Sequence, residues 1–201
     1  MPENIGEESE ILPPSQKGRR YEIQAMAIRE FAGLLFDEQP LDPFALARYA
    51  HLLVLDIEDV KGLSEGAKSH LLGAGRNDWS GGAASKPLPD GRKLIILNPT
   101  HSKKRQHATL MEEICHVFLG HKPTQLMVKT SEGGIRTREY QAEIEEEAYA
   151  TGAAALVPYS ALKRMVANGL KPDEIARHFR VSRQLVEYRM KVSRLWRNNQ
   201  E

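Results

Sequence analysis

The sequence has little of several features that mark particular classes of protein. Its only cysteine is Cys115, so no disulfide can form within the chain. No apolar run approaches the roughly 20 residues that cross a membrane, and the polar first 20 residues lack the apolar stretch of a signal peptide. These absences exclude a membrane-spanning protein and a disulfide-rich secreted domain, and we expect a cytoplasmic protein without a membrane partner.

Net charge is also nearly absent, because 28 Lys and Arg stand against 27 Asp and Glu, giving +1. The average hides a split between two regions. Residues 161–201 hold ten Lys and Arg against four Asp and Glu, or +6, which leaves −5 for residues 1–160. With 41% hydrophobic residues the chain can bury a real core. The sequence therefore predicts a globular acidic body followed by a basic C-terminal piece.

Local patterns predict an α+β protein in which helices surround a small three-stranded sheet. Residues 1–19 are rich in Glu, Pro and Ser and are expected to form a flexible arm, and residues 121–138 a long loop or short hairpin. Strands are predicted at 51–57 and 93–97, with a third, edge-like strand near 79–83. Periodicity and capping signals predict helices from Tyr21, from Pro43 after an Asp42 N-cap, and over 63–72, 107–119, 139–156, 160–168, 172–179 and 182–197.

The segment Glu112-Glu113-Ile-Cys-His116 carries the clearest chemistry. At 100° per residue, Glu112 and His116 share one face of the predicted helix one turn apart, and Glu113 lies beside that pair. Two side chains could then bind one metal ion while the third carboxylate reaches its water, as in the His-Glu-x-x-His helix of zinc peptidases. Taken alone, such a pattern is more often a solvated acidic face.

A second acidic helix follows in the sequence. Glu139, Glu143 and Glu147 are four residues apart and share a stripe, and an Ala-rich run follows up to Pro158. Like charges at this spacing repel each other, so the stripe favours a compensating cation where the helix also packs closely against a neighbour. The alternative is a stripe that faces solvent.

Taken in order, these motifs resemble the ImmA/IrrE metallo-endopeptidase family. The resemblance covers the chain from about Tyr21 to Trp196. It rests on Asp78-Trp-Ser80, Gly91 to Pro99, Arg105, Thr109, the Glu-Glu-x-x-His helix, Glu147-Ala148 with Val157-Pro158, and Glu174 to Ser182. It implies a zincin-like metallopeptidase domain over residues 20–158.

The same resemblance implies the roles of individual residues. Carried over position by position, Glu112, His116 and Glu147 would be the metal ligands, and Glu113 the general base that activates the metal-bound water. The sequence departs from the family at Glu112, where the family has His. Zinc is the implied metal, and an oxygen-richer site also accommodates manganese or iron.

Neighbouring side chains do not supply the missing imidazole from within the helix. His107 points to the opposite face from His116, and His121 lies beyond Gly120, about 140° around the helix. Cys115 could bind zinc as a thiolate, but a buried small side chain is the more frequent role for cysteine. The sequence therefore leaves Glu112 as the candidate first ligand.

Residues 159–201 are predicted to form a basic subdomain that resembles a helix-turn-helix. Ile175 and Phe179 would pack inward, and Arg180 occupies a turn position where glycine is usual. Arg183 and Gln184, at the start of the second helix, are candidate contacts with nucleic acid or a partner. The alternative is a packing role beside the peptidase domain.

The function implied by the resemblance is cleavage of a protein partner, such as a DNA-binding transcriptional repressor, in a stress response. The alternative is a weakened or inactive member of the family that regulates by binding protein or DNA. Glu113 favours activity, because a site that has lost its function has no need of a carboxylate at the position of the base.

Overall fold

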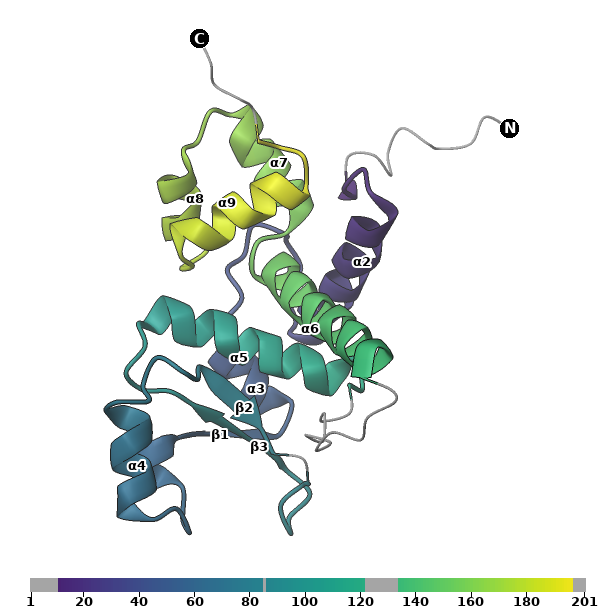
Figure 1. Cartoon of the computed structure of the whole chain (residues 1–201). Helices are drawn as coiled ribbons and strands as arrows, with labels where there is room; N and C mark the ends of the chain where they lie inside the picture. Colours follow the sequence, from purple (N-terminus) through teal and green to yellow (C-terminus); the bar gives the residue numbers. More distant parts are fainter. Residues whose placement is uncertain (1–10, 85, 122–133, 197–201) are drawn as a thin grey trace. The chain divides into compact units, whose positions relative to one another are not determined.

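The computed structural model describes residues 11–84, 86–121 and 134–196, with side chains between 134 and 141 left out. It confirms a mixed α+β fold in which helices accompany one small sheet (Figure 1). The chain divides into two compact units, residues 42–149 and residues 1–41 with 150–201. Within the described ranges, no helix has both the length and the apolar character needed to cross a bilayer.

The unit of residues 42–149 contains the sheet. Its strands are β1 (Leu52–Asp56), β2 (Gly81–Ala83) and β3 (Lys93–Leu97), in the order β1-β3-β2. β1 runs parallel to β3, and β2 runs antiparallel to it. The 3-10 turn η1 (Ile57–Asp59) and helix α4 (Glu65–Leu72) lie between β1 and β2 in sequence. All three predicted strands are present, and the Gly81–Ala83 strand lies at an edge as expected.

Helices α3 (Pro43–Tyr49) and α5 (Lys103–Phe118) belong to the same unit. The Asp42 side chain accepts hydrogen bonds from two backbone N–H groups of the first turn of α3, which confirms the predicted N-cap. α5 packs on β2 and β3 and contacts α3. Its Leu110, Met111 and Ile114 are completely buried. The apolar face of α5 therefore fixes the orientation of its acidic residues.

The connection from β3 to α5 is held by two buried amide side chains. Asn98 Nδ2 donates to the carbonyl oxygens of Arg76 and Trp79, at 2.8 and 3.0 Å. Gln106 Nε2 donates to the His101 carbonyl oxygen at 2.9 Å. Because these bonds tie the start of α5 to the end of the sheet, the acidic segment of α5 has a defined place.

The other unit contains α2 (Gln16–Phe31), α7 (Tyr159–Ala167), α8 (Pro172–His178) and α9 (Arg183–Val192). α2 begins five residues before the predicted start at Tyr21, because Ser15 caps it. Only residues 11–19 of the expected arm are described, and part of that segment is helical. α6 (Gly134–Leu156) also begins earlier than expected, and most of the predicted 121–138 loop lies outside the described residues.

The C-terminal helices have the predicted inward-facing residues. Ile175, Phe179 and Val186 are at most 1% exposed. Arg180 has a φ of +58° in the turn between α8 and α9, the conformation that explains why glycine is usual at this position. Ser182 caps α9 by accepting a hydrogen bond from the Leu185 N–H. The pattern that predicted these two helices therefore reflects real packing.

Candidate metal centre

Two carboxylates on α5 are largely buried next to each other. Burial raises the pKa of Glu112 to about 7, and the neighbouring charges of Glu113 and Glu145 add to this effect. Burial also raises the pKa of Glu113 to about 7, with a further contribution from Glu145 and an opposing hydrogen bond to the Ala83 backbone. The ionised forms are therefore costly unless positive charge is brought to the site.

Three donor groups converge at this point, two from α5 and one from α6. Glu112, His116 and Glu145 each offer a ligand atom, and these atoms lie within 4.8 Å of one another. His116 Nε2 is 3.5 Å from a carboxylate oxygen of Glu145. Carboxylate oxygen and imidazole nitrogen are donors that zinc, manganese and iron accept, and two carboxylates balance a divalent charge. The residues therefore fit a divalent cation.

His121 lies next to this group. Its Nδ1 is 3.0 Å from His116 Nδ1, so one ring nitrogen donates a hydrogen bond to the other. Its Nε2 is 3.5 Å from a carboxylate oxygen of Glu147. If His116 Nδ1 carries the proton, His116 Nε2 keeps a lone pair on the side of Glu145. His121 then acts as a link between Glu147 and the candidate ligand His116.

Helix rotation alone did not reveal the position of His121. The structure ends α5 at Phe118 and gives Gly120 a φ of +69°, so the chain turns back and His121 no longer follows the helical repeat. The sequence Gly120-His121, which follows the helix closely, is the signal that could have indicated this turn.

The predicted ligand Glu147 lies near His121, while Glu145 approaches His116. The two are about 200° apart around α6, so they point in different directions. Glu147 is the more buried, at 18% exposure of its side chain against 52% for Glu145. The choice of Glu147 as third ligand stays a prediction, and the structure adds Glu145 as a second candidate. Of the remaining stripe, Glu143 is exposed and the Glu139 side chain is not described.

Three other side chains on or near α5 are described by the protein groups that surround them. Cys115 is completely buried, and burial raises the pKa of its thiol well above the usual range, as expected for a small core residue. The rings of His107 and Phe44 lie 5.6 Å apart, away from the candidate ligands. Burial raises the pKa of Tyr149, and the charge of Glu112 adds to this, which places its hydroxyl near the carboxylate group.

The predicted contact residues on α9 lie on its exposed side. Arg183 forms ion pairs with Glu187 at 2.6 Å and Asp173 at 3.0 Å. Gln184 lines an open groove of about 630 Å³ together with Tyr188 and Trp196, and Lys191 and Arg194 are also in its lining. This surface combines aromatic and basic groups, and its role as a nucleic-acid or partner contact stays a prediction.

Comparison with known proteins identifies the family. The sequence profile of the IrrE N-terminal-like domain, the Peptidase M78 family, matches residues 73–191. The chain belongs to this family. A solved structure of a Mycobacterium tuberculosis transcriptional regulator has the same fold, with a TM-score of 0.50 and 12% identity over 90% of this chain and 48% of the regulator. The chain thus spans about half of that regulator. No match is found among curated proteins.

The family match covers α5, α6 and the C-terminal helices. It includes Glu112, Glu113, His116, Glu145 and Glu147, and it supports a protein of metallopeptidase type. The resemblance inferred from sequence motifs is therefore confirmed at the level of the family.

Proposed function

We propose that the protein is a metal-dependent endopeptidase that cleaves a protein partner, such as a DNA-binding transcriptional repressor. The observation that carries this proposal is the convergence of Glu112, His116 and Glu145 beside Glu113 in a chain of the Peptidase M78 family. Zinc is the metal that we favour, with manganese or iron as alternatives because the donor set is rich in oxygen.

Each residue has a distinct part in this proposal. Glu112, His116 and one carboxylate of α6 would hold the metal, which supplies Lewis acidity to the reaction when bound. Glu113 accepts a proton from the attacking water and returns it to the leaving amine. His121 keeps His116 in the tautomer that offers Nε2.

The test is cleavage of a repressor-type protein by the purified, zinc-loaded chain, followed by mass spectrometry of the fragments. Glu113→Gln should bind metal as the wild type does and give no fragments. Glu143→Gln, a control at an exposed position on α6, should cleave at the wild-type rate. Fragments formed by Glu113→Gln at the wild-type rate would refute the assigned base.

Two features favour a second function: the glutamate at position 112 and the groove on the surface of α9. By the resemblance of the sequence motifs, Glu112 stands where the family has His, and the groove on α9 presents Tyr188, Trp196 and basic side chains. The alternative is therefore a weakened or inactive family member that binds protein or DNA. Glu112→His separates the two functions, because it should raise the cleavage rate of a peptidase and leave the affinity of a binding protein unchanged. DNA binding through phosphate contacts should weaken steeply as salt rises.

A further inference from the structure

The outer edge of β1 is a candidate pairing surface. β3 is the one strand paired with β1 in the described part of the chain, so the opposite edge of β1 has no strand partner there. Edge strands expose unpaired N–H and C=O groups, and proteins usually protect them with charged residues, proline or bulges. Residues 52–55 are Leu-Leu-Val-Leu and contain none of these residue types. Residues 52–55 therefore lack this protection by their own side chains, and Asp56 at the end of the strand is its one charged residue.

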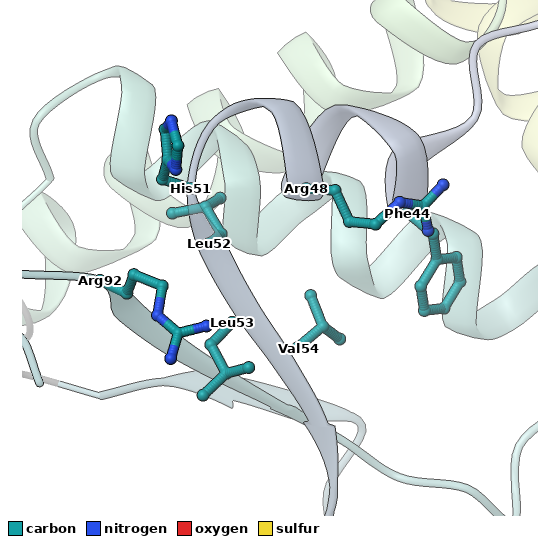
Figure 2. Close-up of a pocket in the computed structure, with 7 residues that line it drawn as sticks. All are labelled: Phe44, Arg48, His51, Leu52, Leu53, Val54 and Arg92. Atoms are coloured by element: carbon teal, nitrogen blue, oxygen red, sulfur yellow. The ribbon is translucent and has the colours of Figure 1, made fainter. Parts of the chain in front are cut away.

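A pocket of about 340 Å³ lies at the start of β1, between residues of α3, β1 and the segment before β3. Its lining includes Leu52, Leu53 and Val54 in sequence, and consecutive strand residues point to opposite faces of a sheet. Figure 2 shows Val54 and Phe44 on one side of the β1 ribbon, and Leu53 and Arg92 on the other. The pocket therefore reaches Leu53 and Val54 of β1, both of which are partly exposed.

Charge is distributed unevenly along the strand. Arg48, His51 and Arg92 line the pocket around the start of β1. Arg92 forms an ion pair with Asp90 at 2.7 Å, whereas the Arg48 side chain has no hydrogen-bond or ion-pair partner within the described ranges.

The opposite end of β1 is acidic. The exposed residues Asp56, Glu58 and Asp59 lie at the end of the strand and in the turn after it. Lys68 reaches this end and donates a hydrogen bond to the backbone carbonyl of Glu58, leaving the Glu58 carboxylate exposed. The exposed Lys61 and the partly buried Lys68 offset part of this charge, so the edge runs from a basic start to an end where three carboxylates outnumber two lysines.

We propose that this edge pairs with β1 of a second copy of the chain, antiparallel and around a twofold axis, to form a continuous six-stranded sheet. An antiparallel pair places the basic start of each strand beside the acidic end of the other, whereas a parallel pair would bring like charges together. The same patch on both copies closes the assembly as a dimer. An acidic peptide from another protein fits the edge less well, because the carboxylates at the end of β1 repel it. This proposal does not depend on the proposed peptidase activity.

Analytical ultracentrifugation of the full chain tests the dimer. The wild type should sediment at twice the 22.6 kDa chain mass. The double variant R48E/R92E has two acidic ends, and D56R/E58R has two basic ends, so each alone should dimerise at least about tenfold more weakly. An equimolar mixture should restore the dimer, because one variant then complements the other. The four substitutions combined in one chain should restore the homodimer as well.

Matched controls distinguish this interface from a general charge effect. Glu143→Lys reverses an exposed charge on α6, away from β1 in sequence, and should leave the dimer unchanged. Circular dichroism of each variant verifies folding. A monomeric wild type, dimers that persist in both double variants, or a mixture that stays monomeric would overturn the proposal. A monomeric wild type that binds an extended acidic peptide would assign the edge to another partner and overturn it too.

Discussion

Two buried acidic environments in this protein differ in how their charge is balanced. Glu22, in the unit of residues 1–41 and 150–201, is 1% exposed. One of its oxygens accepts a hydrogen bond from Arg189 at 2.7 Å, and the other accepts one from the Tyr159 N–H at 2.6 Å. Arg189 also donates to the Val157 carbonyl oxygen. The negative charge of Glu22 is therefore balanced by groups of its own chain.

Glu112 and Glu113 show the opposite arrangement. Both are largely buried with a pKa raised to about 7, and no Lys or Arg pairs with either in the part of the chain that the structure describes. Buried charge without a partner is unfavourable unless a cation or a proton neutralises it. Glu22 therefore serves stability, whereas the two α5 carboxylates lack such compensation among the described residues.

Removal of the compensated carboxylate should have the largest effect on stability. Glu22→Ala leaves Arg189 buried without its partner and should lower the free energy of unfolding by about 3–5 kcal/mol. Urea denaturation of the full chain measures this loss. Glu187→Ala, which breaks the exposed pair with Arg183, serves as control and should cost less than about 1 kcal/mol. Equal effects of the two variants would contradict the structural role of Glu22.

The link through His121 is expected to affect metal affinity. His121→Ala removes the hydrogen-bond partner of His116 Nδ1 and should weaken metal binding by about 10–100-fold, the usual range for residues that orient a ligand. Competition with a chromogenic chelator measures the affinity, and His107→Ala, on the same helix as His116, should leave it unchanged. Unaltered affinity in His121→Ala would show that His116 needs no such support.

Neutralising an uncompensated carboxylate should act in the opposite direction from Glu22→Ala. In metal-free protein, Glu112→Gln removes a charge that burial disfavours and that Glu113 and Glu145 also repel, so stability should rise by less than about 1 kcal/mol. A raised carboxyl pKa destabilises the fold above the ordinary pKa. The gain should therefore appear at about pH 8 and vanish below about pH 4. A loss of stability at about pH 8 would contradict the account of this pair.

An exposed ion pair provides the smallest expected effect. Burial raises the pKa of Asp37, but hydrogen bonds from Arg164 and Ser160 outweigh it, so its pKa is lowered overall. A lowered carboxyl pKa stabilises the fold above the ordinary pKa, and this contribution is lost as pH falls through the folded value. Asp37→Asn should cost about 1 kcal/mol or less at neutral pH and nothing at about pH 2. Urea unfolding at both pH values measures it, and a constant cost would refute the link to ionisation.

Local signals in the sequence predicted most elements of the fold. Asp42 and Ser182 act as the expected N-caps, because capping depends on a few neighbouring residues. The early start of α5 was missed, although Ser102 caps it. Alternating apolar residues and β-branched side chains predicted the strands. No local signal could show that β1 pairs parallel to β3. Pairing of distant segments depends on tertiary packing.

The candidate site was predictable only in part for the same reason. Helical spacing correctly placed Glu112 and His116 together on α5. Which carboxylate of α6 approaches them depends on how the two helices pack, so the stripe through Glu147 did not single out Glu145. The position of His121 was not predicted, because it depends on the turn at Gly120.

We propose that the α5 carboxylates bind a metal ion, and quantification of bound metal tests this proposal. Metal analysis of the purified chain after zinc loading and desalting should give one equivalent, lost in Glu112→Ala and His116→Ala and retained in Glu143→Ala. Loss in only one of Glu145→Ala and Glu147→Ala would identify the third ligand. A wild type that holds no more metal than His116→Ala would contradict the claim.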